Sequence, residues 1–164
     1  MLRFTPCRFF AVAAILVAAA LLIARASEFW GGLVPCALCL LGRWPYRVVL
    51  AFALLGLAVP ARMKAFCAAG MLAGMLASVA VGAVHVGVEA GWWPSPLAEC
   101  VARFTPGTGV AGLPERPAKP CDEPAYLVPG LPVSMAMMSL LFSVAVAGGV
   151  AAGLVRLRRE AAAG

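Results

Sequence analysis

The chain has 164 residues, of which 63% are hydrophobic and only 12% are charged, and its mean hydropathy is +0.97. This composition excludes an ordinary soluble domain with a polar surface. The formal net charge is +6, but the sequence has no basic soluble face of the kind that binds nucleic acid. We therefore expect a protein that lies in the lipid bilayer and has no nucleic-acid partner.

Four apolar stretches are close to or above the roughly 17 to 25 residues that a helix needs to cross a bilayer. A helix satisfies its backbone polar groups internally, and the sequence lacks the alternation of β-barrel strands. The fold class predicted is therefore an all-α membrane protein, a four-transmembrane-helix bundle that forms a single domain over residues 1–164. The expected helices cover about residues 9–25, 36–59, 65–88 and 131–155, and the loops on the outer side of the membrane cover residues 26–35 and 89–130.

The first apolar stretch also resembles a signal peptide, because a basic start and an apolar run precede Ala24-Arg25-Ala26, an A-x-A-like cleavage site. We expect this segment to be retained, since four helices enclose an intramembrane site better than three. An intact-mass measurement tests this expectation: loss of the first 26 residues would reject the four-helix bundle.

The distribution of charge predicts the orientation. With a cytoplasmic N-terminus, the inner side carries seven basic residues and one acidic residue, whereas the outer side carries six of each. The positive-inside rule then places both termini in the cytoplasm. The excess positive charge is thus a topology signal.

The same orientation sorts the six cysteines. Cys36, Cys39, Cys100 and Cys121 fall on the outer, oxidising side, where they would form two disulfides with any of three connectivities. Cys7 and Cys67 fall at the inner edge, and we interpret them as small buried or interfacial thiols without a role.

A C-x-x-C motif opens the second expected helix. Pro35 favours a helix start, and the helix dipole and free amide groups of a first turn stabilise the thiolate of Cys36. The spacing also occurs in zinc sites, haem attachment and structural disulfides. No histidine follows Cys39, an oxidising compartment favours disulfides over zinc thiolates, and the tight loop is more typical of exchangeable bridges. The motif therefore indicates redox chemistry.

Three ionisable side chains are candidates near this motif. Arg43 follows Cys39 by one helical turn, so its guanidinium would lie beside the sulfur or beside a polar acceptor docked there. Arg47 either has a function or extends to the lipid headgroups. His85, the only histidine, is either a satisfied histidine of the bundle or a functional group. It shares a helix face with residues whose small size allows close helix packing: Gly70, Gly74, Ser78 and Gly82.

The segment from Glu89 to Leu131 contains eight prolines, which exclude a long helix and predict an extended proline-rich loop that carries Cys100 and Cys121. Within it, residues Leu97 to Phe104 would form one short surface helix. In the last expected helix, Gly149 and Gly153 form a second close-packing pair.

Several of these features occur together in one known family. The segment Pro35-Cys36-x-x-Cys39-x-x-x-Arg43-x-Pro45, the segment His85-Val-Gly-Val-Glu89 followed by two tryptophans, the late pair Cys100 and Cys121, and Ser134-Met-Ala136 resemble the disulfide bond formation protein B (DsbB) family. The resemblance covers nearly the whole chain, and its motifs are specific in combination.

The resemblance implies a protein-disulfide-forming, quinone-dependent oxidoreductase of the bacterial inner (cytoplasmic) membrane. Its redox cysteines and the proline-rich loop would be periplasmic. It would take electrons from a periplasmic DsbA-like protein of thioredoxin fold and pass them to ubiquinone or menaquinone, with no metal cofactor. Cys100 would form the mixed disulfide with that partner, Cys121 would exchange with Cys36, and Cys39 would meet the quinone as a thiolate. Arg43 would stabilise charge at the quinone, and His85 would lie near the ring.

Three rival functions differ in testable ways. A vitamin K epoxide reductase-like protein is also a four-helix redox bundle, but its C-x-x-C belongs to the last helix rather than the second. A metal carrier would use Cys36, Cys39 and His85 as ligands. A structural scaffold would use the four outer cysteines only as braces.

Overall fold

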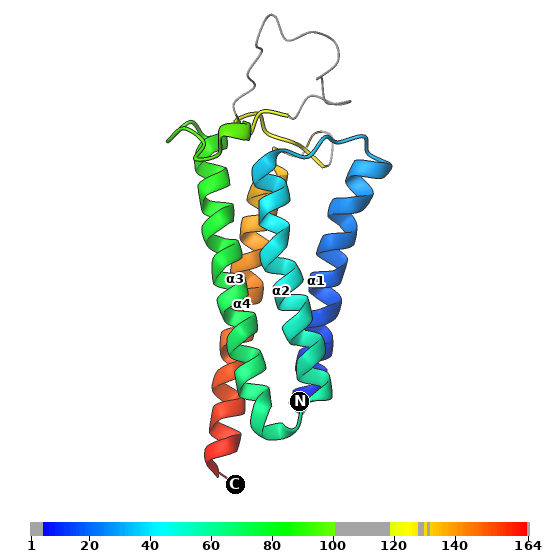
Figure 1. The fold of residues 1–164 in the computed structure, drawn as a ribbon, viewed down its shortest axis with the longest axis vertical. Helices are drawn as coiled ribbons and strands as arrows, with labels where there is room; N and C mark the ends of the chain where they lie inside the picture. The colour runs from blue at the N-terminus through cyan, green and yellow to red at the C-terminus, as the bar shows by residue number, and fades with distance from the viewer. Residues whose placement is uncertain (1–4, 101–118, 128–129, 131, 164) are drawn as a thin grey trace, which may run out of the picture.

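The computed structural model describes residues 5–100, 119–127, 130 and 132–163. It consists of four long α-helices, α1 (Pro6–Phe29), α2 (Ala37–Ala58), α3 (Ala61–Glu89) and α4 (Met135–Ala163), and a 3-10 turn η1 (Ala98–Cys100). All four α-helices are long and apolar enough to cross a membrane, and no strand occurs in this part of the chain. They run side by side with both termini at one end (Figure 1). The all-α class with four candidate spans is thus confirmed.

The helices differ from the expected ranges at their ends. Helix α1 continues to Phe29, four residues past the expected end, so it includes the Ala24-Arg25-Ala26 segment. An ion pair between Arg25 and Glu28, three residues apart, supports this extra turn. Helix α4 begins at Met135 rather than at residue 131, because Pro132 precedes it and the hydroxyl of Ser134 caps it by accepting from the Met137 amide. The last turn of α1 thus carries Glu28, and Ser134 lies directly before α4.

The main core fills the half of the bundle near the termini. Phe10, Val17, Val49, Ala53 and Met71 are fully buried there. Close approach between helices depends on small residues: a Cβ atom at Gly74 of α3 would lie 2.6 Å from the Val49 side chain of α2. The small-residue ridge on α3 therefore packs as its spacing predicts.

Of the second expected close-packing pair, Gly149 and Gly153, only one glycine lies close to a neighbouring helix. A Cβ atom at Gly153 would lie 2.3 Å from the Phe9 ring of α1, whereas a Cβ atom at Gly149 would meet no described heavy atom within 4 Å. The prediction that Gly149 is a close-packing position is therefore wrong, because that face of α4 has no described neighbour. Only Gly153 allows α1 to approach.

Buried hydroxyl groups join α2, α3 and α4 at mid-bundle. The Ser143 hydroxyl of α4 lies 2.8 Å from both the Tyr46 hydroxyl of α2 and the Ser78 hydroxyl of α3. Ser143 also donates to the Ser139 carbonyl at 2.8 Å. In an apolar environment these hydrogen bonds satisfy groups that would otherwise be costly to bury.

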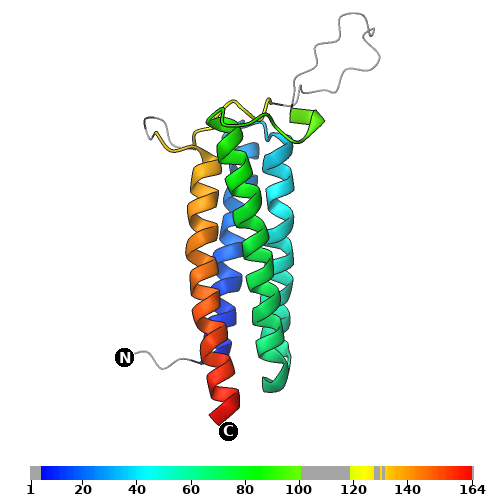
Figure 2. The same ribbon diagram turned by 90° about the vertical axis from the view of Figure 1, so that its left-hand side faces the viewer.

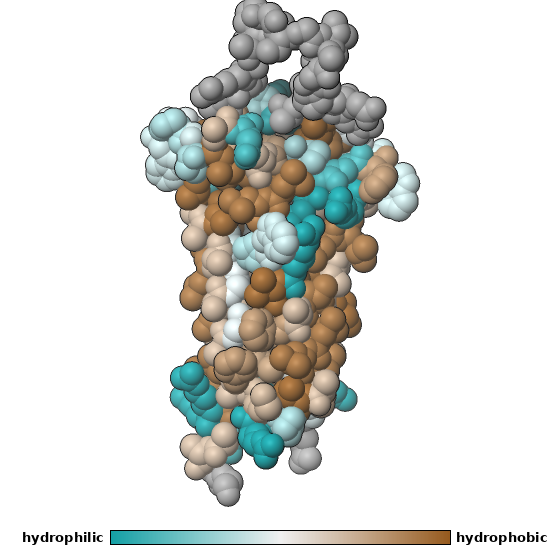
Figure 3. Space-filling view, in the orientation of Figure 1, coloured by the Kyte–Doolittle hydropathy of each residue, from teal (hydrophilic) through white to brown (hydrophobic). Residues whose placement is uncertain are grey.

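The end opposite the termini carries the α1–α2 connection, η1 and the described residues before α4 (Figure 2). Figure 2, the view turned by 90°, shows the α1–α2 connection, η1 and the segment before α4 crossing this end together. Of the short surface helix expected over Leu97 to Phe104, the structure has η1, and residues 101–104 lie outside the described residues. Apolar residues cover the middle of the face drawn in Figure 3, and hydrophilic residues gather at its lower end and toward the loops. This pattern suits a protein embedded in a bilayer.

Candidate functional site

Cys36 occupies the N-cap of α2, directly after Pro35 and before the first helical turn. Its sulfur accepts a hydrogen bond from the backbone N–H of Cys39 at 3.2 Å. Only 3% of Cys36 is exposed. The sequence therefore folds locally so that an unpaired amide at the helix start points at a thiol, although Cys36 is the N-cap and not, as expected, part of the first turn.

The two cysteines of the motif are free and lie together. Their sulfur atoms are 2.7 Å apart and share a hydrogen bond. This bond is the main reason why the pKa of Cys36, which precedes the membrane-spanning part of α2, is lowered to about 4; burial opposes the shift, and His85 and the Cys39 amide support it. At neutral pH the lowered pKa favours a thiolate at Cys36, whereas the resemblance implies a thiolate at Cys39.

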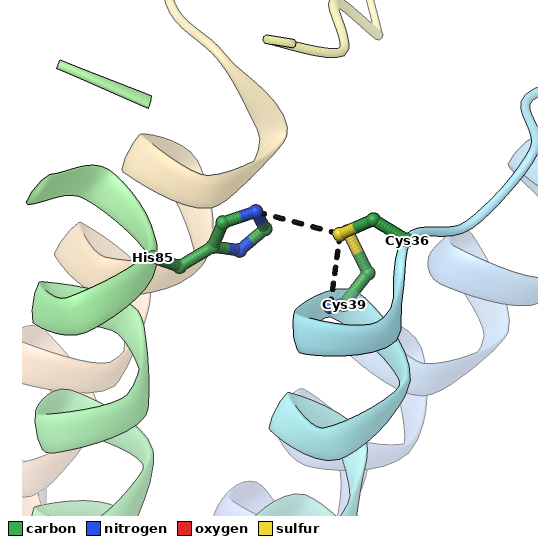
Figure 4. Close-up of side chains that lie close together, drawn as sticks. All are labelled: Cys36, Cys39 and His85. Atoms are coloured by element: carbon green, nitrogen blue, oxygen red, sulfur yellow. Dashed lines mark hydrogen bonds between the residues drawn. The ribbon is translucent and has the colours of Figure 1, made fainter. Parts of the chain in front are cut away.

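His85 reaches this pair from α3, as Figure 4 shows. Its Nε2 atom lies 3.5 Å from the Cys36 sulfur and 3.8 Å from Oε1 of Glu89, one turn further along α3. The other oxygen of Glu89 accepts a hydrogen bond from the Ser134 hydroxyl before α4. A chain of polar groups therefore runs from α2 through α3 to the start of α4, and it can hold and orient a proton near the thiols.

Arg43 has a partner that the sequence analysis counted only in the charge balance. Its Nη2 group donates to Oε1 of Glu28 in the last turns of α1. Arg43 is 8% exposed, and its Nη1 atom is buried without a hydrogen-bond partner among the described residues. The guanidinium is thus paired with α1, and its buried Nη1 donor fits the expectation of a docked polar acceptor.

Cys100 and Cys121 form a disulfide at the loop end of the bundle. They pack in one buried cluster with Cys36, Leu38 and Val88, and Cys39 lies against it. The structure thus resolves the open connectivity: the loop pair is oxidised while the helix pair is reduced. It also brings together the two pairs, which are 61 residues apart in the sequence from Cys39 to Cys100.

A cavity of about 500 Å³ opens beside the loop disulfide. Cys100 contributes to its wall together with Val88, Trp93, Pro120 and Asp122. Both loop cysteines are buried, Cys100 at 4% and Cys121 at 1% exposure. Of the two, only Cys100 lines this cavity among the residues that the structure describes.

Cys36, Cys39 and His85 also offer three ligand atoms within 4.8 Å of one another. In a tetrahedral zinc site with Zn–S bonds of about 2.3 Å, two sulfurs would stand about 3.8 Å apart. The observed separation is 2.7 Å. The two sulfurs are thus closer together than the thiolate ligands of a tetrahedral zinc site.

Arg47 lies on the exposed face of α2. Its guanidinium stacks over the Trp44 ring, 5.0 Å from the ring centroid, and both residues are exposed. This position suits a side chain that reaches the headgroup region.

Glu28, Glu89 and Ser134 complete the site. Glu28 could have been found as an acidic residue at the end of an apolar helix, and Glu89 as the fourth residue after His85. Neither spacing identifies the partner on another helix. Their contacts depend on how α1, α3 and α4 pack around the start of α2.

The family described as "Disulfide bond formation protein DsbB" matches residues 6–153. The match includes α1, both cysteine pairs and most of α4. No curated protein and no solved structure matches the chain.

Proposed function

Because the chain belongs to the disulfide bond formation protein B (DsbB) family, we propose that it is a membrane thiol:quinone oxidoreductase that reoxidises a periplasmic DsbA-like dithiol protein. Family membership itself makes it a disulfide-forming thiol oxidoreductase, and its four candidate spans make it a multi-pass membrane protein. The partner, the electron acceptor and the residue roles are the proposal. The observation that carries it is the single buried cluster of Cys36, Cys100 and Cys121.

Electrons enter at Cys100. A thiolate of the partner attacks the Cys100 sulfur, the bond to Cys121 breaks, and Cys121 leaves as a thiolate. The second partner thiol then attacks the mixed disulfide, so the partner leaves oxidised and Cys100 is reduced. The cavity beside Cys100 and the burial of Cys121 support this order of attack.

The loop dithiol then reduces the helix pair. The Cys121 thiolate attacks Cys36 of an oxidised Cys36–Cys39 bridge and releases Cys39. Cys100 next attacks Cys121, which closes the loop disulfide again and releases Cys36. Two electrons have moved, and the product is the arrangement described above, an oxidised loop pair beside a reduced helix pair.

Electrons leave through Cys39. A membrane quinone, ubiquinone or menaquinone, supplies an acceptor for two electrons and two protons when it is bound. Cys39 faces it, Arg43 binds its oxygen through the unpaired Nη1 group, and His85 holds a proton near the Cys36 sulfur. Loss of two electrons restores the Cys36–Cys39 disulfide, and no metal takes part.

The proposed location is the bacterial inner membrane, with the cysteine pairs in the periplasm and both termini in the cytoplasm. The excess of basic residues at the termini and in the α2–α3 turn supports this orientation. The two termini lie at the end of the bundle opposite the start of α2 (Figure 1). An oxidising compartment at the cysteine end is also what the loop disulfide requires.

The test is a turnover assay with the purified protein in detergent. It uses a reduced thioredoxin-fold dithiol protein as donor and short-chain ubiquinone or menaquinone as acceptor, and it follows quinone absorbance. Cys36→Ser and Cys39→Ser should abolish turnover, whereas Cys7→Ser, a matched change at the other end of the bundle, should not. Retained turnover in either of the first two variants would reject the relay.

Metal analysis addresses the carrier alternative. An anaerobically purified, reduced sample is expected to hold less than one zinc or copper ion per ten chains. A stoichiometric metal content that falls in Cys36→Ser would instead make this a metal-binding protein. The vitamin K epoxide reductase-like alternative has little support, because the C-x-x-C pair opens α2 and not the last helix.

A further inference from the structure

Arg43 offers a buried donor for which the described protein supplies no acceptor. Its Nη2 group bonds Glu28, but its Nη1 group is enclosed and unpaired among the residues that the structure describes. Buried polar groups in folded proteins nearly always have partners, and an unpaired charged donor is costly. The Nη1 group is therefore matched by an acceptor that a ligand brings.

Glu28 determines how this donor is presented. It belongs to the last turn of α1, and its side chain is 16% exposed. One carboxylate oxygen binds Arg43, and the other lies 3.5 Å from Nη1 of Arg25, whose side chain is 56% exposed. Because a guanidinium is planar and rigid, fixing its Nη2 edge also fixes the direction of its Nη1 group.

The ion pair between Arg43 and Glu28 also affects the charge at this position. An unpaired arginine within a membrane span tends to extend to the headgroups. Pairing with Glu28 holds Arg43 inside and makes the two residues together neutral. The unpaired Nη1 group of this ion pair can donate to an uncharged oxygen acceptor.

We propose that Glu28 is a positioning residue for the electron acceptor: it holds Arg43 so that Nη1 can donate to a quinone carbonyl oxygen at the α1–α2 interface, one helical turn from Cys39. This inference rests on the proposed function and deepens it. It makes α1 a part of the acceptor site, although α1 carries none of the four redox cysteines.

Glu28→Gln tests this role, and two measurements are made on the full chain in detergent. Equilibrium dialysis with a short-chain ubiquinone gives a Kd that does not depend on turnover, and steady-state assays give KM and kcat. We expect Kd and KM to rise about tenfold, the size of one lost charge-assisted hydrogen bond, while kcat at saturating quinone changes less than about threefold. Arg25→Gln, which removes the exposed partner of Glu28, is the matched control and should leave Kd and KM unchanged.

A double-mutant cycle separates positioning from a structural role. Arg43→Gln is expected to weaken quinone binding at least as much as Glu28→Gln. Because Glu28 acts through Arg43, adding Glu28→Gln to Arg43→Gln should change Kd by less than about twofold. The double variant carries no unpaired buried charge, so this comparison remains decisive even where Glu28→Gln alone does not fold.

The outcomes have distinct meanings. A wild-type Kd in Glu28→Gln, or an independent tenfold loss on adding it to Arg43→Gln, would overturn the positioning role. An Arg25→Gln variant that loses binding as Glu28→Gln does would also overturn it. Failure of the wild-type protein to oxidise a dithiol partner with any quinone would instead reject the proposed function itself.

Discussion

His85 of α3 places Nε2 3.5 Å from the sulfur of Cys36 at the N-cap of α2. Together with the Cys39 thiol and amide, it surrounds one sulfur with three polar groups at the start of a helix (Figure 4). Such an environment stabilises a thiolate at Cys36, the sulfur that is released in the proposed relay when the loop disulfide closes again. The contact joins two helices, so it is sensitive to their packing.

Replacing this histidine should change the reactivity of Cys36. In reduced His85→Asn we expect the pKa of Cys36 to rise above its value of about 4, because a hydrogen bond and a favourable charge interaction are removed. Loss of a group that holds a proton at the thiol should also slow turnover at neutral pH by roughly a hundredfold. The pH dependence of iodoacetamide labelling, followed by mass spectrometry, gives the pKa.

Cys36→Ser serves as the control for that titration, since it should remove the labelling seen at low pH. The two variants together assign the low-pH signal to one sulfur. An unchanged titration midpoint in His85→Asn would contradict a role for His85 at Cys36.

The lowered pKa of Cys36 also predicts how the reduction potential depends on pH. Above about 4 the reduced pair carries one proton rather than two. The stabilisation of the dithiol form is complete above the ordinary thiol pKa of about 8.5 and is lost as the pH falls toward 4. Between pH 5 and 7.5 the potential should therefore fall by about 30 mV per pH unit, not by about 59 mV.

A redox titration against a dithiothreitol buffer measures this slope. The sample is a variant in which Cys7, Cys67, Cys100 and Cys121 are replaced by alanine, so only the helix pair reacts. A slope of about 59 mV per pH unit would mean that both thiols are protonated and would contradict the thiolate at Cys36.

The order of the relay predicts which cysteine traps the partner. In Cys121→Ser the loop disulfide cannot form, and Cys100 remains beside the cavity. With an oxidised thioredoxin-fold dithiol protein we expect a mixed disulfide through Cys100, because the Cys121 thiol proposed to resolve it is missing. Tryptic mass spectrometry identifies the linkage. An adduct at Cys36 would reverse the proposed order of electron flow.

Helix packing predicts a stability difference between two glycines. A Cβ atom at Gly56 would lie 2.3 Å from the Phe10 ring, so Gly56→Ala should lower the free energy of unfolding in detergent by about 1–3 kcal/mol. Gly149→Ala is the matched control, since a Cβ atom there meets no described heavy atom within 4 Å. Denaturant titration followed by circular dichroism measures both, and equal stability of the two variants would contradict the α1–α2 packing.

The DsbB assignment and the class of chemistry follow from short-range features of the chain. Apolar stretches long enough to span a bilayer predict helices, because a helix satisfies its backbone polar groups internally. The C-x-x-C spacing, Pro35 and the helix start put two thiols on one turn without help from any other element. Cys100 and Cys121 are then the remaining pair of cysteines on the oxidising side.

The partners of the charged groups were decided only by the tertiary structure. Spacing placed Arg43 one turn after Cys39, but the extra turn of α1 carries Glu28 to it and pairs the guanidinium with that carboxylate. The same holds for His85, whose contact with Cys36 depends on the way α3 packs on α2. The periodicity of a sequence predicts which residues share a face of a helix. The residues that they contact depend on how the neighbouring helix is rotated and where it ends, and both depend on packing along the whole bundle.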